Sequence, residues 1–375
     1  MYQNTLKWCS MKSQRVFDPK QPFFDLPPVP PDKVEYEKIE VLKQEALSRA
    51  AVAELKGIAH IIPNQNILVN AIVLREAKDS SEIENIVTTQ DEIYKAITLK
   101  TKKTIDPAAK EVVRYREALW QGTHAIRRKR LLSISDIVKI QSIIVRNDAG
   151  IRTTPGTAIV NDRNNKIIYT PPQNEQRIKT LFQNFVDYLN NDDDSLTKSA
   201  ILHYQFEAIH PFYDGNGRTG RIVNVLYLIL KQHLDIPILY LSSYIIERKS
   251  EYYRLLLEVS SDCQWDKWIL FILKGIEETA KLTIEKLRAI KELMDKTIEF
   301  VRQTAPKIYS KELVETLFVH PYCKNEFIEQ STGVERKAAS RYLHKLSEIG
   351  VLDTNRIGRE NIFINKKLMQ LLRDV

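Results

Sequence analysis

Apolar residues recur at three- and four-residue steps through most of the chain before about residue 305, and this spacing predicts a chain built mainly of helices. The first helical run begins at about Val34 and ends before Pro63, and a second passes through residues 70–77. Residues 88–92 have the composition of a helix start. Later helices are predicted near residues 108–127, 135–146, 177–189, 196–209, 219–231 and 249–258, followed by one or two long helices over 265–305.

One segment interrupts this helical pattern with two β-prone runs. The first consists of Thr157, Ala158, Ile159 and Val160, and the second covers residues 166–169. The intervening Asn-Asp-Arg-Asn-Asn sequence is rich in turn-forming residues. The pattern therefore predicts a β-hairpin within a helical region.

The chain after about residue 306 has a different pattern. Three helices are predicted over residues 311–319, 325–330 and 334–349, and two β-prone runs follow at 351–354 and 361–364. This order resembles a winged helix-turn-helix. The third helix would expose cations suited to DNA phosphates, and these are Arg336, Lys337, Arg341 and Lys345. Contact with a protein, including dimerisation, is an equally good interpretation.

Composition narrows the class of protein only slightly. The chain has 375 residues, 43% of them hydrophobic and 28% charged, which is ordinary for globular domains. The net charge of +8 permits a nucleic-acid or polyphosphate partner without requiring one. With only 11 glycines, a glycine-rich α/β nucleotide fold is disfavoured.

The opening stretch, MYQNTLKWCSMKSQRVF, does not have the apolar core of a signal peptide. No apolar run approaches the ~20 residues that span a bilayer. We therefore expect a cytoplasmic protein without a membrane partner.

The strongest chemical signal is the string His-Pro-Phe-Tyr-Asp-Gly-Asn-Gly-Arg-Thr-Gly-Arg at residues 210–221. Its Asp-Gly-Asn-Gly part predicts a loop whose backbone N–H groups lie at the start of the helix over 219–231. Loop amides and a helix N-terminus together form an anion site. Each part alone is common in proteins, but their occurrence together indicates a function.

The charged residues of this string suit a polyphosphate. Arg218 and Arg221 lie three positions apart, so both guanidinium groups can face the same pocket. Asp214 is an oxygen ligand for Mg²⁺ held jointly with phosphates. His210 can accept a hydroxyl proton near neutral pH. The spacing predicts a site that binds a polyphosphate and activates a nucleophile beside it.

This string resembles the signature of the Fic (Fido) family, HPF-x-(D/E)-GN-G-R-x-x-R, and matches it at every fixed position. The resemblance implies transfer of AMP from ATP to a Ser, Thr or Tyr hydroxyl of a protein. It assigns His210 as general base and Asp214 as the Mg²⁺ ligand. It also implies nucleotide-binding roles for Gly215, Asn216, Gly217, Arg218, Thr219, Gly220 and Arg221, with Tyr252, Tyr253 and Glu247 on the adenine side.

The same resemblance gives the hairpin at Thr157–Tyr169 a role, as a flap that holds an extended target segment by strand pairing. It also implies a fold class that is mostly α, with a Fic-type helical core, a β-hairpin flap and a small C-terminal winged helix-turn-helix domain. The expected divisions are an N-terminal helical region at 1–130, a catalytic core at 131–275, a connecting helix at 276–305 and the winged helix at 306–375.

A second pattern lies in the N-terminal region. Ser80, Glu84 and Asn85 fit the inhibitory pattern (S/T)-x-x-x-E-(G/N) of the Fic family within residues 80–85. In that interpretation Glu84 occupies Arg221 and blocks productive ATP binding. The alternative is local, because Ser81 and Glu84 also have the spacing of a capping box that starts a helix.

Other functions stay open at this point. The chain is alternatively a DNA-binding regulator that uses the Fic core as a nucleotide sensor, a transferase for another diphosphate-containing donor, or an enzyme that removes AMP. The expected partners are ATP and a hydroxyl-bearing protein, which includes the chain itself or a second copy in a homodimer.

Overall fold

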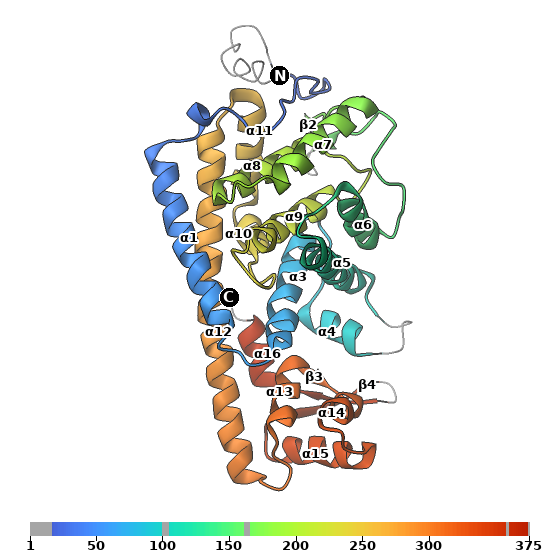
Figure 1. Ribbon diagram of the computed structural model, residues 1–375. Coiled ribbons are helices and arrows are strands. Elements are labelled where there is room, and N and C mark those ends of the chain that lie inside the picture. Colours follow the sequence, from blue (N-terminus) through green and yellow to red (C-terminus); the bar gives the residue numbers. More distant parts are fainter. Residues whose placement is uncertain (1–16, 100–104, 161–165, 358–359, 374–375) are drawn as a thin grey trace.

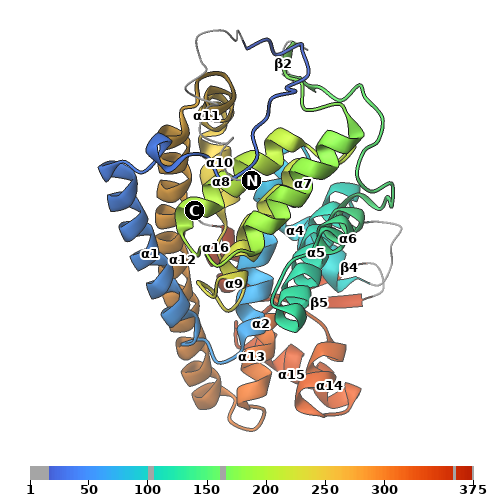
Figure 2. The ribbon, with the colours of Figure 1, turned by 45° about the horizontal axis from the view of Figure 1, so that its top comes forward.

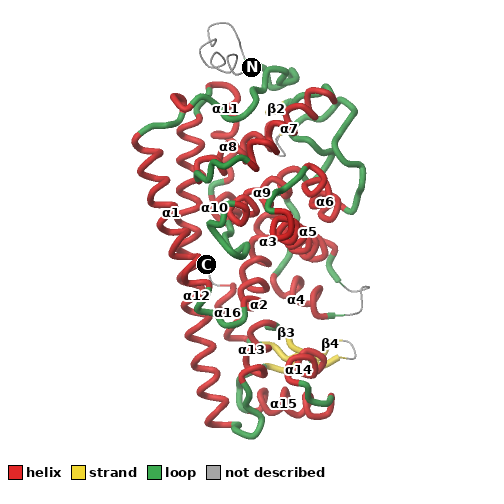
Figure 3. The backbone as a smooth tube through the Cα atoms, viewed as in Figure 1, coloured by secondary structure: helices red, strands yellow, loops and turns green. Residues whose placement is uncertain are grey.

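The computed structural model describes residues 17–99, 105–160, 166–357 and 360–373. Helices form most of it, and one long helix runs along a side of the molecule (Figures 1 and 3). The N-terminal elements are η3 (Lys33–Glu35), α1 (Ile39–Ala59), α2 (Gln65–Leu68), η4 (Val69–Val73), α3 (Leu74–Ile83), α4 (Gln90–Thr98), α5 (Pro107–Lys129) and α6 (Ile134–Val145). The central elements are β1 (Ile159–Val160), β2 (Ile167–Tyr169), α7 (Glu175–Asn190), α8 (Leu196–Ile209), α9 (Asn216–Leu230), α10 (Leu241–Glu247), α11 (Lys249–Asp262) and α12 (Trp265–Thr304). The remaining elements are α13 (Lys311–Val319), β3 (Tyr322–Cys323), α14 (Asn325–Thr332), α15 (Arg336–Glu348), β4 (Asp353–Ile357), β5 (Glu360–Ile364) and α16 (Lys366–Arg373).

The long segment after Trp265 is one helix and not two. With 40 residues, α12 extends about 60 Å at ~1.5 Å per residue. Its apolar stripe packs against α1, whose buried residues include Val41, Val52 and Leu55 at helical spacing. The predicted domain division at residue 275 falls inside this continuous helix. The division therefore stays a prediction.

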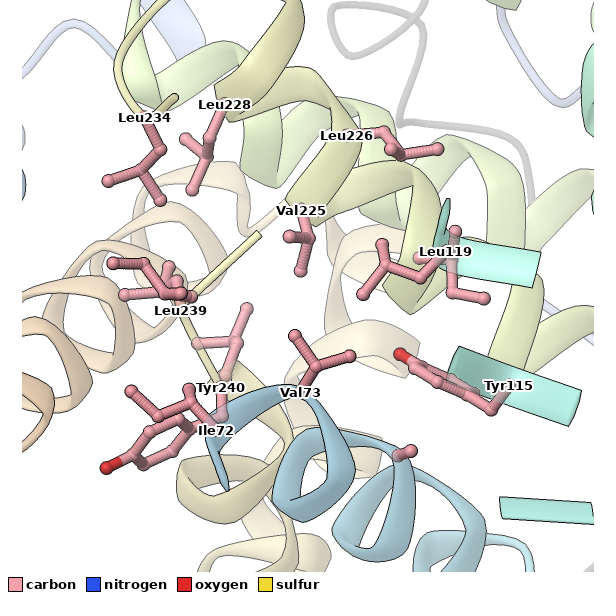
Figure 4. Packing of buried hydrophobic residues seen from close by; sticks show 14 of the residues in the cluster. Ile72, Val73, Tyr115, Leu119, Val225, Leu226, Leu228, Leu234, Leu239 and Tyr240 are labelled. Carbon is pink, nitrogen blue, oxygen red and sulfur yellow. The ribbon is translucent and has the colours of Figure 1, made fainter. Parts of the chain in front are cut away.

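The buried core surrounds α9, and Figure 4 shows how its neighbours meet there. Side chains from several elements interdigitate at this point, among them Ile72, Val73, Tyr115, Leu119, Val225, Leu226, Leu239 and Tyr240. Gly122 allows the close approach of α5 to α9, because a Cβ at this position would lie 2.3 Å from a methyl carbon of Leu226. Close packing therefore fixes α9, the helix that begins in the 210–221 string.

The chain before α1 packs along the outside of α7 and α8 (Figure 2). Leu26 and Val29 are buried there. The side chain of Asn184 both donates to and accepts from the backbone of Val29, and Arg177 donates to the carbonyl of Leu26. These bonds attach the extended segment to α7, which packs against α8.

The predicted hairpin is confirmed as an antiparallel pair of short strands. Ile159 pairs with Tyr169 and Val160 with Ile167, with an irregular register between the two pairs. The residues of the connecting turn, 161–165, lie outside the described residues. The hairpin lies on the outside of the helical core, next to the extended N-terminal segment (Figure 2).

The C-terminal region contains the predicted three helices followed by two strands. Strand β4 begins two residues later than expected and continues to Ile357, because Asp353–Ile357 pair in register with β5. Residues 358–359, between the strands, lie outside the described residues. The sequence prediction missed β3, which completes an antiparallel sheet of order β3-β5-β4, and it also missed α16. Strand β3 has only two residues and so carries no periodic signal, whereas α16 has buried apolar residues at helical spacing, Leu368, Met369 and Leu372, which the sequence analysis overlooked.

This C-terminal region docks on α4. The rings of Tyr94 and Tyr322 stack with centroids 5.7 Å apart. Asp91 accepts hydrogen bonds from the hydroxyl of Tyr322 and the guanidinium of Arg373. Among the described residues, no helix combines the length and the apolar character needed to cross a bilayer.

Candidate active site

The 210–221 string connects α8 to α9 through two residues with left-handed backbone conformations. His210 ends α8 with φ 49° and ψ 61°. Gly215, with φ 77°, directly precedes α9. The sharp reversal brings the C-terminus of one helix beside the N-terminus of the next, so the His210 residue and the free amides of α9 lie in the same region.

The predicted start of the second helix is wrong by three residues. Helix α9 begins at Asn216 and not at Thr219. The Asn216 side chain explains the early start, because it accepts a hydrogen bond from the amide of Phe212 at 2.9 Å and donates to the Phe212 carbonyl at 2.8 Å. These two bonds fold the loop back on the first turn. Asn216 is therefore a buried brace of the loop, a role that the spacing did not indicate.

Arg221 lies in the interior, and its guanidinium is already occupied. Only 3% of its side chain is exposed. Nε donates to the hydroxyl of Ser80 at 2.8 Å, and Nη2 donates to the Ser80 carbonyl at 2.9 Å and to Oε1 of Glu84 at 2.8 Å. The structure thus brings together three residues that the sequence analysis named from two distant patterns.

Glu84 reaches Arg221 because α3 ends immediately before it. Glu84 is the C-terminal cap of α3, and Asn85 follows with φ 61°, a conformation that asparagine and glycine tolerate better than other residues. Ser81 lies inside α3 and donates to the carbonyl of Ala77. The capping-box alternative is therefore wrong, since Ser81 and Glu84 end a helix and do not start one.

Glu84 also lies close to the first turn of α9. A Cβ at Gly217 would lie 2.2 Å from Oε1 of Glu84 and 3.0 Å from Nη1 of Arg221. The absence of a side chain at Gly217 is thus required for the carboxylate to reach the guanidinium. The side chain of Glu84 is 36% exposed, so the pair is open to solvent on the carboxylate side.

The second arginine of the string points to a different carboxylate. Arg218 is buried, and Nη1 donates to Oε2 of Glu111 on α5 at 3.1 Å. Its Nη2 lies 3.7 Å from Oδ1 of Asp214. Glu111 lies 107 positions before Arg218 and belongs to no motif, so sequence reasoning did not find it.

His210 lies among groups of both charge signs. Burial and the positive charge of Arg152 lower the pKa of His210 to about 4, against the opposing effect of the Glu84 and Asp214 carboxylates. A neutral imidazole is the form that accepts a proton. In the described part of the chain, the buried Nδ1 of His210 has no hydrogen-bond partner.

Asp214 is the most exposed charged residue of the string. Its side chain is 75% exposed, and Oδ1 accepts a hydrogen bond from the amide of Gly215 at 2.6 Å. The described residues hold no group of three or more metal-ligating side chains. A single exposed carboxylate beside an anion site fits a cation whose other ligands are substrate phosphates and water.

Two further residues of the first turns of α9 are buried. Thr219 is fully buried, and its hydroxyl has no hydrogen-bond partner in the part of the chain that the structure describes. Gly220 faces α8, where a Cβ would lie 2.6 Å from Oε1 of Glu207. Gly220 therefore serves the approach of the two helices.

The three residues expected on the adenine side lie on α10 and α11 and differ in exposure. Tyr252 is buried, and its hydroxyl lies 2.9 Å from Nε2 of His203. Tyr253 is partly exposed, and its ring packs edge-on against that of Tyr252. Glu247 pairs with Arg248 at 3.0 Å. The hydrogen bond of Tyr252 gives it a structural role within an aromatic cluster.

The remaining predicted residues lie on the hairpin and on α15. Thr157, Ala158 and Ile159 are half-buried, and Val160 is exposed. On α15 the four predicted basic residues are all exposed, and these are Arg336, Lys337, Arg341 and Lys345. The structure does not bring them near the 210–221 string (Figure 1).

Three family models match consecutive parts of the chain. The Fic/DOC family N-terminal model matches residues 42–124, and the Fic/DOC family model matches 131–228. The model of the C-terminal domain of SoFic-like protein adenylyltransferases matches 293–368. The chain thus contains regions that match the two Fic/DOC family models and a region that matches the SoFic-like C-terminal domain.

Curated relatives match over limited stretches. Protein adenylyltransferase fic-1 of Caenorhabditis elegans is 33% identical over 131 residues, which cover 32% of this chain and 23% of the relative. A probable protein adenylyltransferase of Aquifex aeolicus is 48% identical over 48 residues, or 12% of this chain and 15% of the relative. The aligned regions thus span about a quarter or less of these relatives.

Solved structures share the fold. A Fic family protein from Desulfovibrio desulfuricans matches with a TM-score of 0.56 and 18% identity, covering 87% of this chain and 96% of that chain. Fic-1 from C. elegans, residues 134–508, matches with a TM-score of 0.50 and 18% identity, covering 66% of this chain and 74% of that one. The expected fold class, mostly helical with a Fic-type core and small antiparallel sheets, is confirmed.

Proposed function

We propose that this chain transfers AMP from ATP to a hydroxyl group of a protein and that Glu84 restrains the transfer. The observation that carries this proposal is the junction of α8 and α9, where His210 lies beside the free amides of a helix start and two buried arginines. Relatives named protein adenylyltransferase support the choice of reaction.

In the proposed reaction His210 accepts the proton of the target hydroxyl while the hydroxyl oxygen attacks the α-phosphorus of ATP. A new phosphorus–oxygen bond forms to the target, the bond to the bridging oxygen breaks, and pyrophosphate leaves. The lowered pKa of His210 keeps the imidazole unprotonated before the reaction. The backbone amides at the start of α9 and the guanidinium groups stabilise the charge on the phosphates.

Asp214 would hold Mg²⁺ together with substrate phosphates, and the ion would supply neutralisation of the leaving pyrophosphate. The hairpin β1–β2 would bind the target segment along its exposed strand at Val160. Tyr253 offers an exposed ring for the base, whereas the buried Tyr252 would act by supporting it.

The restraint follows from competition for one guanidinium. Glu84 and a terminal phosphate are both anions that bind an arginine through the same donors. While Glu84 holds Nη2 of Arg221 at 2.8 Å, the γ-phosphate cannot take that position. Removal of the Glu84 carboxylate should therefore increase AMP transfer, and the occupied Arg221 supports this direction.

The proposal is tested by mass spectrometry of a cell lysate incubated with ATP, Mg²⁺ and the Glu84→Gly variant. The matched control carries both Glu84→Gly and His210→Ala. We expect a mass increase of one AMP on a Ser, Thr or Tyr hydroxyl with the first variant and none with the second. If a protein is modified only after another nucleotide or phosphocompound replaces ATP, that compound is the donor. If no protein is modified with any donor, the proposal is contradicted.

A second candidate rests on the exposed cations of α15. Their exposure suits contact with DNA phosphates, and the chain would then be a regulator whose Fic core senses nucleotide. A sensor needs no general base, so the preserved His210 favours the enzymatic function.

A further inference from the structure

The structure contains a fully buried cation that no sequence motif singled out. Arg152 lies in the segment between α6 and the hairpin and has 0% of its surface exposed. A buried guanidinium is unfavourable unless it is paired or fully hydrogen-bonded. No carboxylate among the described residues forms an ion pair with it, so its burial calls for another partner.

The partners of Arg152 are backbone carbonyls at the end of α8. Nε donates to the carbonyl of His210 at 2.7 Å, and Nη2 donates to the carbonyl of Ile209 at 3.2 Å. Nη2 also donates to the carbonyl of Pro172 after the hairpin. The last carbonyls of a helix carry partial negative charge and have no partner inside the helix. Arg152 thus caps α8 through Nε and Nη2, while its buried Nη1 has no hydrogen-bond partner among the described residues.

The backbone around Arg152 reinforces the same contact. Its amide donates to the carbonyl of Pro211 at 2.9 Å, and Ile151 forms an isolated bridge with Phe212. The amide of Thr153 donates to the hydroxyl of Tyr213 at 2.9 Å. The segment before the hairpin therefore binds the 210–221 string at several consecutive positions.

This contact falls on a residue with an uncommon conformation. His210 has φ 49°, a conformation that is unfavourable for a residue with a Cβ relative to a right-handed helix. A left-handed histidine persists when surrounding bonds hold it. The bonds from Arg152 to the carbonyls on both sides of the turn provide such restraint.

We infer that Arg152 is a positioning residue for the proposed reaction, whose fork locks the left-handed turn at His210 and directs the imidazole toward the start of α9. This inference rests on the proposed function, because it takes AMP transfer as the reaction. The restraint on the imidazole ring is a property of the folded chain and does not depend on that reaction. Arg152 touches no substrate in this account and acts only through His210.

The charge of Arg152 has a consequence for acidity. The charged groups facing His210 are Arg152 before the hairpin, Glu84 at the end of α3 and Asp214 before α9, and Glu207 on α8 contributes through its backbone. Arg152 is the cation of this set and lowers the pKa of His210, whereas the carboxylates raise it. Loss of the arginine charge should therefore raise the pKa of His210.

The test measures kcat and KM for AMP transfer against pH in the Glu84→Gly background. Arg152→Gln removes both charge and fork, Arg152→Lys keeps the charge, and Arg177→Gln is the matched control because Arg177 also donates to a backbone carbonyl. We expect Arg152→Gln to lower kcat by ~10–100-fold with KM for ATP little changed. The acidic limb of the pH profile of kcat should move upward by about one pH unit in Arg152→Gln. In Arg152→Lys the limb should stay in place while kcat remains reduced.

The contradicting results are equally specific. A pH profile of Arg152→Gln that matches the Arg177→Gln control overturns the inference. A rate loss that is the same at every pH, in both Arg152 variants and in proportion to unfolding seen by thermal melting, also overturns it and assigns a purely structural role.

A second measurement does not depend on any enzymatic activity. NMR of histidine-labelled protein follows the His210 ring during a pH titration, with the signal assigned by its loss in His210→Ala. We expect a higher midpoint in Arg152→Gln than in the parent, with Arg152→Lys near the parent. An unchanged midpoint in Arg152→Gln contradicts the inference, even if AMP transfer proves not to be the reaction.

Discussion

The junction of α8 and α9 and the exposed face of α15 both carry arginines, but they hold them in opposite ways. Arg218 and Arg221 are buried, and each has carboxylate or hydroxyl partners from distant helices. Arg336 and Arg341 on α15 are exposed. The first region fixes its cations by the fold, whereas the second leaves them to water.

This difference decides how much chemistry can be inferred from each region. A buried guanidinium must have partners, so its contacts show which groups bind it and which ligands could replace them. An exposed guanidinium is satisfied by solvent, and its role depends on a partner outside the chain. The α8–α9 junction therefore supports a specific reaction, while α15 supports only a class of contact.

The largest expected effect comes from the imidazole. His210→Ala in the Glu84→Gly background should lower AMP transfer at least ~100-fold, because a positioned general base contributes ~10²–10⁴-fold. Arg341→Ala in the same background should leave the rate unchanged. Initial rates on the modified protein, or on the chain itself, measure both. Equal rates for the two variants would contradict the assignment of catalysis to the α8–α9 junction and not to α15.

A stability comparison gives the next largest effect. Arg221→Met leaves the Glu84 carboxylate and the buried Ser80 groups without their donor, and we expect a loss of about 1–3 kcal/mol in the free energy of unfolding. Arg341→Met should change it by less than ~0.5 kcal/mol. Urea unfolding followed by circular dichroism compares them. A loss below ~1 kcal/mol for Arg221→Met would show that the Glu84–Arg221 pair is not structurally required.

The Glu84–Arg221 pair also predicts a pH dependence. Burial acts to raise the pKa of Glu84, but the charge and hydrogen bond of Arg221 outweigh it and lower the pKa below its usual value of 4.5. A group with a lowered pKa in the folded state stabilises the protein above pH ~4.5, the pKa of the unfolded chain. This stabilisation is lost as the pH falls through the pKa of the folded state. The wild type should therefore be more stable than Glu84→Gln near pH 7.

That advantage should shrink as the pH falls below ~4.5 and disappear below the lowered pKa of folded Glu84, where the carboxylate is protonated in both folded and unfolded chains. Thermal melting of the two proteins from pH 7 to pH 3 measures the difference. Glu329→Gln, at a half-buried position on α14, is the matched control and should show no such change. A constant difference between wild type and Glu84→Gln at every pH contradicts the assignment.

The smallest and most conditional effect concerns α15. Replacement of its four exposed basic residues by alanine should leave unfolding and AMP transfer unchanged. If the region binds DNA, the same variant should weaken binding to a random duplex by at least ~tenfold at low salt and flatten the dependence on salt concentration. Fluorescence anisotropy measures both. Identical binding by variant and wild type removes DNA phosphates as the partner of this face.

The features that the sequence predicted are those that depend on residues close together in the chain. The helical periods, the hairpin and the 210–221 string needed no tertiary information, and the resemblance of Ser80, Glu84 and Asn85 to the inhibitory pattern of the Fic family implied that Glu84 is the partner of Arg221. The same local reasoning misplaced the start of α9, since Asn216 could not be recognised as a brace of the Phe212 backbone. Local spacing thus finds the string but not its internal bonds.

The contacts that the sequence did not predict are all between distant segments. Glu111 meets Arg218 across α5 and α9, and Arg152 meets the end of α8 across more than fifty positions. Neither residue belongs to a motif, and both bind groups that every protein contains, a guanidinium and a backbone carbonyl. Only the packing of helices determines which such groups meet.

The central claim is that a competent site is held back by one carboxylate. Its most direct test compares the initial rate at which ³²P passes from α-labelled ATP to protein in wild type and in Glu84→Gly, with γ-labelled ATP in parallel. We predict an increase of at least ~tenfold, equivalent to ~1.4 kcal/mol, from the α-label only. Equal rates from α-labelled ATP, or label arriving from the γ-phosphate, would contradict the account.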